Sequence, residues 1–312
     1  MELNVKTQIV DAAKNYAENN ALSQEAVAEK AGMNISYVNA MFRGNFYLKL
    51  SNGKSVKIKD SYFRKLAKAA GHNFETVFWE TVETPQYLQI YAELADAKRS
   101  GRAKMLIGET GCGKTYTIDR FINDNPVHVY RITVSDLYSV NDIVDELCEL
   151  LNVTAAGRPV AKLKKIARKF NNIKLDGGKP VLIVDEAENL NKKALRAFKG
   201  LYDAVRDFCP IVLVGTGDLS DRLDKLNDKK EPGIPQFVRR FKAGRRNIIS
   251  VDKRMFAPFF VRVEDEDVRT LIETLSCNYG DLNSYIEPAL REAAETKEEL
   301  TEERFRFQFG LI

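Results

Sequence analysis

GETGCGKT, residues 108–115, is the stretch that decides the fold of this chain. It follows the apolar run at 105–107 and precedes residues that can continue as a helix. Every fixed position of the phosphate-loop pattern G-x-x-x-x-G-K-[ST] is filled, in the strand-to-helix context that the pattern requires. We therefore predict a nucleoside triphosphate site, with ATP and Mg²⁺ as the expected ligands.

The residue types of this loop suit a triphosphate. Glycines let backbone amides curl around phosphate oxygens, Lys114 can reach the β and γ phosphates, and the Thr115 hydroxyl can ligate magnesium. Cys112 occupies a free position whose backbone matters more than its thiol, so it is not expected to be a nucleophile. The expected nucleotide contacts are Gly108, Glu109, Thr110, Gly111, Cys112, Gly113, Lys114, Thr115, Tyr116 and Asp185.

An acidic pair downstream indicates hydrolysis. In VLIVDEAENL, residues 181–190, Asp185 ends a strand and can hold magnesium, while Glu186 can orient and polarise an attacking water. A kinase has no use for a water-activating base at this place, so the pair favours an ATPase. Thr216, which ends the apolar run at 211–216, is predicted to add a polar contact near the γ-phosphate.

Positive charge for the transition state can come from a neighbouring subunit. PQFVRRF offers Arg239 and Arg240, of which we favour Arg240 as the catalytic arginine. The cluster continues through Lys242, Arg245 and Arg246, and Arg245 and Arg246 are expected DNA contacts. A solvated charged face remains the alternative for the whole cluster.

Residues 1–75 are predicted to form a small helix-turn-helix domain. Apolar residues recur at helical spacing on both sides of Gly32, which can end one helix while Asn34 caps the next. Val38 and Phe42 would then face inward. The outward residues expected to contact DNA are Ser36, Tyr37, Asn39 and Arg43.

FYLKLSNGKSVKIK, residues 46–59, alternates apolar and polar positions about Asn52–Gly53, which predicts a β-hairpin. The hairpin presents lysines, and Lys54 and Lys57 are expected to contact DNA. A helix over 61–70 would close the domain. A helical module that binds protein rather than DNA is the alternative, because helix-turn-helix patterns are common by chance.

The rest of the chain changes pattern. Residues 76–84 are predicted as a linker, 85–251 as the ATPase core, and 252–312 as a helical lid and tail. Apolar strands are expected near 103–107, 127–132, 180–185, 211–216 and 246–251, and helices near 136–151, 160–170, 192–208 and 218–226. Strands that are apolar nearly throughout and alternate with helices predict an α/β fold with a parallel sheet covered on both faces.

Composition narrows the class of protein. The chain has 312 residues, 44% of them apolar, and a net charge of +4. No run approaches the roughly 18 apolar residues needed to span a bilayer, and the first residues lack a signal-peptide pattern, so we expect a cytoplasmic protein without a membrane partner. The four cysteines are widely spaced and include no CxxC, which predicts reduced thiols.

The motifs, taken in order, resemble those of the AAA+ ATPases. GETGCGKT corresponds to Walker A, VLIVDE to Walker B, IVLVGT to the sensor 1 strand and VRRF to an arginine-finger region. The resemblance covers roughly residues 84–300. It implies an AAA+ P-loop module with a parallel five-stranded sheet and a helical lid, here preceded by the helix-turn-helix domain.

Within this superfamily the chain looks most like the Mu B family, because a small helix-turn-helix domain precedes a single ATPase module. That resemblance implies head-to-tail assembly into filaments on double-stranded DNA with little sequence preference, followed by delivery of the DNA to a transposase and stimulation of strand transfer. In related proteins an arginine in a GDLR-like lid motif often touches the nucleotide. Here GDLNS has Asn283, and Arg291 is the candidate replacement.

Three other functions are considered. One is a nucleotide-responsive helix-turn-helix transcription regulator, and the second is an AAA+ helicase loader or initiator. The third, a small-molecule kinase, would need an arginine-rich lid and gives no reason for Glu186. Retention of Glu186 together with an arginine-finger candidate favours turnover in an oligomer over passive nucleotide sensing.

Overall fold

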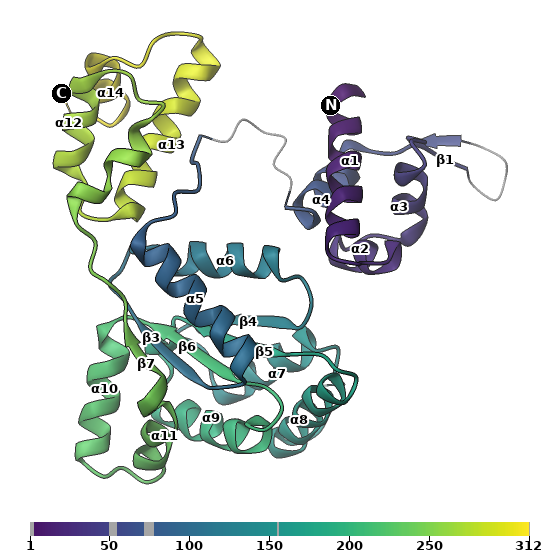
Figure 1. Ribbon diagram of the computed structural model, residues 1–312, viewed down its shortest axis with the longest axis vertical. Coiled ribbons are helices and arrows are strands. Elements are labelled where there is room, and N and C mark those ends of the chain that lie inside the picture. Colours follow the sequence, from purple (N-terminus) through teal and green to yellow (C-terminus); the bar gives the residue numbers. More distant parts are fainter. Residues whose placement is uncertain (1–2, 50–54, 72–77, 155, 312) are drawn as a thin grey trace. The chain divides into compact units, whose positions relative to one another are not determined.

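The computed structural model describes residues 3–49, 55–71, 78–154 and 156–311. The chain divides into two compact units, Met1–Val77 and Phe78–Ile312 (Figure 1). Each unit has its own hydrophobic core. In the described residues, no helix has the length and apolar character needed to cross a membrane.

The first unit is built from four helices and a small hairpin. Its elements are α1 (Leu3–Asn19), α2 (Gln24–Lys30), α3 (Ile35–Phe42), α4 (Asp60–Ala69), and the antiparallel strands β1 (Tyr47–Lys49) and β2 (Ser55–Lys57). Between α2 and α3, Gly32 has φ +58°, a conformation that favours glycine. Asn34 then caps α3, because its side chain accepts a hydrogen bond from Ser36 N at 2.9 Å.

The second unit contains a five-stranded parallel sheet, as predicted. Its strands are β3 (Lys104–Ile107), β4 (Val129–Thr133), β5 (Val181–Asp185), β6 (Ile211–Gly215) and β7 (Arg245–Asn247), in the order β4-β5-β6-β3-β7. β7 is shorter than expected. Its one neighbour in the sheet, β3, ends at Ile107 where the phosphate loop begins, so the ladder has no partner further along.

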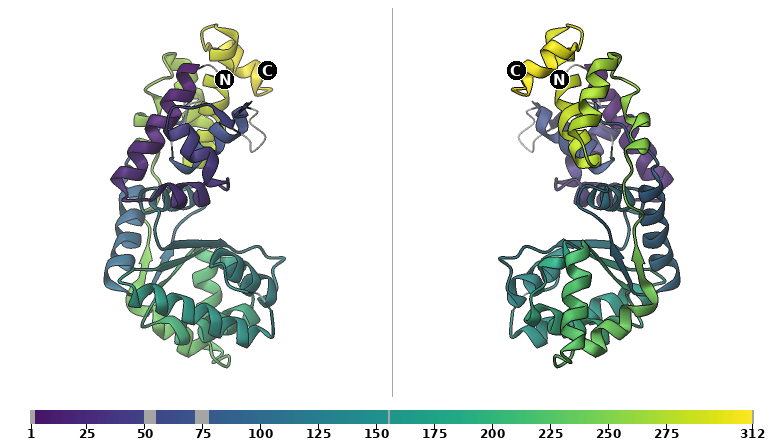
Figure 2. Two further views of the ribbon diagram at one scale, coloured as in Figure 1. Left: turned by 90° about the vertical axis from the view of Figure 1, so that its right-hand side faces the viewer. Right: turned by 90° about the vertical axis from the view of Figure 1, so that its left-hand side faces the viewer.

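Two helical layers cover the sheet (Figure 1) and are seen from the side in Figure 2. One layer holds α5 (Pro85–Ser100) and α6 (Lys114–Asp124). The other holds α7 (Val140–Leu150), α8 (Pro159–Leu175), α9 (Lys192–Val205), α10 (Gly217–Asp228) and α11 (Ile234–Phe241). Alternate strand residues serve the two layers: Leu106 packs with α5 and α6, whereas Met105 packs with the other layer. This two-sided burial explains the nearly continuous apolar strands.

The carboxyl-terminal part forms a helical lid. It contains α12 (Glu266–Leu275), α13 (Tyr279–Thr296) and α14 (Glu302–Gln308), around buried residues that include Phe256, Ile272 and Phe305. Phe78 and Trp79 pack against the same cluster. Residues 78–84 of the predicted linker 76–84 form no regular helix or strand, and these two half-buried aromatic side chains attach the segment to the lid.

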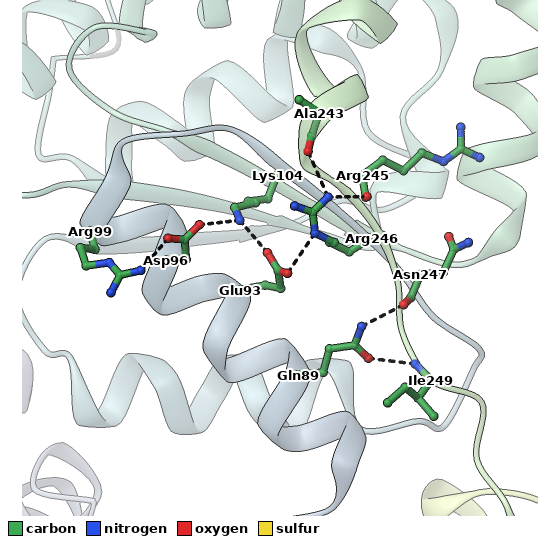
Figure 3. Close-up of polar contacts among 10 residues, drawn as sticks. All are labelled: Gln89, Glu93, Asp96, Arg99, Lys104, Ala243, Arg245, Arg246, Asn247 and Ile249. Carbon is green, nitrogen blue, oxygen red and sulfur yellow. Dashed lines mark hydrogen bonds and ion pairs between the residues drawn. The ribbon is translucent and has the colours of Figure 1, made fainter.

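A charge network centred on the buried Lys104 fixes α5 to the sheet (Figure 3). Lys104 Nζ, on β3, lies 2.6 Å from both Glu93 Oε2 and Asp96 Oδ2. Arg246 Nε on β7 reaches the other oxygen of Glu93 at 3.1 Å, and Arg99 Nη2 reaches Asp96 at 2.9 Å. The bond from Lys104, assisted by Arg99, lowers the pKa of Asp96 to about 2. The network joins the two strands beside the phosphate loop to one helix.

We predict that Asp96→Asn weakens the fold in a pH-dependent way. Since folding lowers the pKa of Asp96 from 3.8 to about 2, its pairing stabilises the fold above its ordinary pKa and is lost as pH falls through about 2. At pH 7 the variant should lose about 1 kcal/mol of unfolding free energy, because the carboxylate is partly exposed and screened. Its stability should also fall less steeply between pH 4 and pH 2.

Urea unfolding across a pH series measures this effect. Asp228→Asn is the matched control, because Asp228 is an exposed α10 aspartate for which the described residues show no ion pair. Parallel pH profiles for the wild type and Asp96→Asn would contradict the stabilising role of the Lys104 network.

Candidate nucleotide-binding site

The phosphate loop forms one wall of a cavity of about 510 Å³. The loop turns between β3 and α6, and α6 begins at Lys114, so backbone N–H groups at its first turn face the cavity. Gly111 has φ +75°, and a Cβ there would collide with the Asn278 side chain of the lid, so glycine is required. Seven loop residues line the cavity: Thr110, Gly111, Cys112, Gly113, Lys114, Thr115 and Tyr116.

Gly108 and Glu109, the first two predicted contacts, act through their carbonyl groups. Lys114 Nζ donates hydrogen bonds to the carbonyl oxygens of Gly108 at 2.9 Å and Glu109 at 2.8 Å. The ammonium is therefore held over the loop, where a phosphate group would meet it. Cys112 is buried, and burial raises the pKa of its thiol, which disfavours the nucleophilic thiolate.

Asp185 is the most buried acidic group of the site. Its side chain is 1% exposed, and its Oδ2 accepts bonds from Thr115 Oγ1 at 3.0 Å and from Arg131 Nη2 at 2.8 Å. Its Oδ1 accepts a bond from Glu186 N at 3.0 Å. The structure thus brings Thr115 and Asp185 together, as a shared magnesium ligand set requires.

Arg131 is a site residue that our sequence analysis missed. Besides Asp185, its guanidinium binds Asp119 of α6, with Nη1 2.6 Å from Oδ1. A sequence signal exists: an arginine interrupts the apolar strand VHVYRI, and a charge there needs a partner when buried. The identity of that partner comes only from the pairing of β4 with β5.

Glu186 follows Asp185 in a strained conformation. Its φ of +53° places a residue with a Cβ in the left-handed region, which costs energy and is concentrated at functional sites. The side chain is exposed, and Asn189 Nδ2 donates to Glu186 Oε2 at 3.4 Å. The strained turn directs Glu186 away from the buried strand end and into the lining of the cavity.

Two buried oxygens at the cavity fit a site for a polar ligand. Thr216 Oγ1 and Glu188 Oε2 have no hydrogen-bond partner within the part of the chain that the structure describes. Both residues line the cavity. Since buried polar groups in proteins are almost always satisfied, these atoms fit a site whose partner is a bound nucleotide, metal ion or water. Glu188 was not predicted.

Aromatic side chains form the opposite wall. Trp79 stacks on Phe259 with centroids 4.8 Å apart, and Phe259 lies 5.2 Å from Tyr279. Such a flat apolar wall suits an aromatic base. Gly280 N donates to Gly111 O at 3.3 Å, so the lid also contacts the phosphate loop directly. Sequence reasoning missed these residues because they come from three distant segments.

The lid has no arginine at the predicted motif position. Asn283 itself lines the cavity. Arg291, the candidate replacement, instead binds the Glu287 carboxylate, and its guanidinium lies 5.7 Å from the Phe78 ring centroid. Arg291 therefore serves the packing of the lid against residue 78 in this structure.

The favoured arginine finger has intrachain partners. Arg240 binds Asp203 and donates to Gln236 O at 2.7 Å, and its guanidinium lies over the Tyr202 ring. Arg239 is exposed, and the described residues offer it no hydrogen bond or ion pair. Of the two arginines, Arg239 is the one left open to a neighbouring molecule in this structure, and the choice of the finger stays a prediction.

The arrangement of Arg245 and Arg246 differs from the predicted DNA-facing patch. Arg245 binds both oxygens of Asp224 at 3.0 Å and also contacts Ser220, whereas Arg246 binds Glu93 (Figure 3). The reason is that β7 is an edge strand between α10 and α5, and each helix presents an acidic residue to it. Both guanidinium groups are therefore engaged within the chain.

In the first unit, the predicted DNA contacts fall into three groups. Ser36, Arg43 and Lys57 are exposed, and Asn39 is half-buried. Tyr37 was expected to face outward, but its ring stacks on Tyr62 with centroids 4.1 Å apart, because the two residues meet where α3 and α4 pack. Lys54 lies outside the described residues.

Comparison with known proteins agrees with this site. Residues 97–223 match the family model described as AAA domain. No curated protein matches the chain. The structure of the Aeropyrum pernix ORC1 protein in complex with DNA is 14% identical, with a TM-score of 0.55 over 74% of this chain and 66% of that chain. The chain thus spans slightly less than two thirds of ORC1.

Two further structures give similar values. The Aeropyrum pernix ORC2 protein, solved as ADPNP and ADP complexes, is 14% identical, with a TM-score of 0.54 over 74% of this chain and 69% of that chain. Cdc6p from Pyrobaculum aerophilum is 16% identical, with a TM-score of 0.52 over 72% and 66%. Residues 97–223 thus carry an AAA-type P-loop ATPase domain, and the chain has the fold of these proteins.

Proposed function

We propose that this protein is an ATP-dependent DNA-binding ATPase of the initiator or helicase-loader type, which assembles on duplex DNA with ATP and is reset by hydrolysis. The observation that carries the proposal is one chain that joins a phosphate loop, a buried Asp185 and a strained Glu186 to a separate helix-turn-helix unit. The likeness in fold to ORC1, solved with DNA, supports the initiator type.

The chemistry follows from the positions of the side chains. Lys114 and the amides of the loop bind the β and γ phosphates, and Thr115 and Asp185 hold magnesium. An ion held there would supply positive charge that offsets the negative charge developing on the phosphate groups. Arg131 fixes one oxygen of Asp185 from the neighbouring strand. Glu186 orients water for attack, and Thr216 offers its unpaired hydroxyl to the γ-phosphate.

The second candidate is a Mu B-type activator that delivers target DNA to a transposase. The observation in its favour is the order of the chain, with the helix-turn-helix unit ahead of a single ATPase unit. It shares the ATP-dependent, sequence-indifferent binding of duplex DNA with the first candidate. The two functions differ in the protein that receives the DNA.

We predict that Glu186→Gln binds ATP normally but hydrolyses it at least about 100-fold more slowly, because the amide cannot accept a proton from water. Steady-state phosphate release and equilibrium ATP binding measure the two effects. Glu188→Gln is the comparison, since Glu188 is the other acidic residue at the cavity wall with a buried unpaired oxygen. Unchanged turnover in Glu186→Gln, with loss in Glu188→Gln, would transfer the role of base to Glu188.

We predict opposite effects for the two neighbouring arginines. Arg239→Ala should lower turnover of the assembled protein by about a thousandfold, the low end for a finger residue, without changing the thermal midpoint. Arg240→Ala should lower the thermal midpoint, because Asp203 and Tyr202 lose their partner. Turnover measured against protein concentration, together with thermal unfolding, separates the two roles. Full activity in Arg239→Ala would exclude it as the finger.

The decisive test is binding of labelled, arbitrary-sequence duplex DNA with ATP, ADP or no nucleotide, across a salt series. The proposal predicts cooperative, sequence-indifferent binding only with ATP, and none for Lys114→Ala. Binding that ignores nucleotide, or that needs one chosen sequence, would favour a transcription regulator. Two further assays then separate the two candidate functions. Loading of an added helicase onto DNA would support the initiator or loader, and stimulated strand transfer by an added Mu-type transposase would support the Mu B-type activator.

A further inference from the structure

The helix α8 carries charge of one sign. Its positive residues are Lys162, Lys164, Lys165, Arg168, Lys169 and Lys174, and it contains no acidic residue. Protein surfaces ordinarily mix both signs, and a stripe of one sign raises the local concentration of an opposite partner. We propose that the outer face of α8 is a second DNA-contacting surface, on the ATPase unit, that binds duplex phosphates. This inference rests on the proposed function in assuming DNA as the ligand.

Half of these cations already have partners inside the chain. Lys162 binds Asp145 of α7, and Lys174 Nζ donates to Asp207 O at 2.7 Å. Lys165 Nζ donates to the carbonyl oxygens of Thr154 and Ala156, each at 3.3 Å. These three lysines serve packing and loop structure, and they are not the basis of the inference.

The other three cations, Lys164, Arg168 and Lys169, face outward. All are exposed, and among the described residues none of them makes a hydrogen bond or ion pair. The apolar side of the helix, with Ile166 and Phe170, is buried in the core. Charged residues four apart on a helix are neighbours, so Lys164 repels Arg168 and Lys165 repels Lys169. An anionic partner relieves this repulsion.

The positive region continues beyond the helix. Lys98 and Lys179 lie close enough to interact, since the pKa of Lys98 is lowered by burial and then by Lys179. His128 has its pKa lowered by burial and then by Lys98, with Lys169 acting in the same direction and Asp176 against it. Lys98 of α5, Lys169 of α8 and Lys179 just before β5 therefore share one region, with Asp176 as an opposing charge.

The shape of this surface favours DNA over other anionic partners. Lys164, Arg168 and Lys169 lie within six residues of α8, about 8 Å along its axis, so together with the neighbouring lysines they can meet more than one phosphate of a duplex. A helix that lies in a membrane surface must present its apolar side to lipid. Here that side is already buried against the sheet and α9. Contacts of this kind would be indifferent to sequence.

The test uses the full chain with Lys164→Gln, Arg168→Gln and Lys169→Gln combined. The matched control combines Lys225→Gln, Lys229→Gln and Lys230→Gln, which removes the same charge from exposed positions in and just after α10. Binding of two unrelated labelled duplexes is followed by anisotropy with ATP across a salt series. We expect at least a tenfold weaker Kd for the α8 variant on both duplexes, and less than a twofold change for the control.

The salt dependence identifies the contacts as phosphate contacts. Loss of three such contacts should make the slope of log affinity against log salt shallower by about 2 to 3. Thermal unfolding checks that the triple variant is folded. If the triple variant does not fold, the double variant Lys164→Gln with Lys169→Gln takes its place, with an expected change in slope of about 2. Equal binding and equal slope in the α8 variant and the wild type would overturn the α8 assignment while leaving the proposed function intact. A wild type that binds no duplex with any nucleotide would overturn both.

Discussion

The site depends on one buried carboxylate. Asp185 ends a central strand with its side chain excluded from solvent, where an unpaired charge would be prohibitively unfavourable. Thr115 from the phosphate-loop helix, Arg131 from the adjacent strand and the backbone of Glu186 all bond to it. The need to satisfy this charge brings the loop, two strands and the strained Glu186 turn into one fixed arrangement.

Around this centre, the cavity is assembled from segments that are far apart in the chain. The phosphate loop and strand ends supply polar groups, whereas Trp79, Phe259 and Tyr279 supply an aromatic wall from the entry segment and the lid. The contact of Gly280 with Gly111 means that the lid and loop share a boundary. A nucleotide bound here would therefore touch both the core and the lid.

The arginines and lysines of this protein differ in whether they form ion pairs within the chain or stay exposed to solvent, and their neighbours decide which. Arg245 and Arg246 stabilise an edge strand through acidic partners on two helices, and Arg240 packs on Tyr202. Arg239 and the outer face of α8 remain open to solvent. A basic run in a sequence shows how many positive side chains are present. Only the fold decides which of them form ion pairs with carboxylates of the same chain and which stay available to another molecule.

The sequence alone determined the phosphate loop, the acidic strand end and the parallel sheet, because each depends on short-range patterns: glycines at a turn, apolar runs, and helices between them. It also placed Gly32 and Asn34 at a helix boundary, where local backbone geometry decides. The tertiary structure decided that Arg131 pairs with Asp185, that Trp79 lines the cavity, and that the half-buried Tyr37 stacks on Tyr62. These outcomes depend on which distant segments pack together, and no local pattern encodes the partner of a side chain.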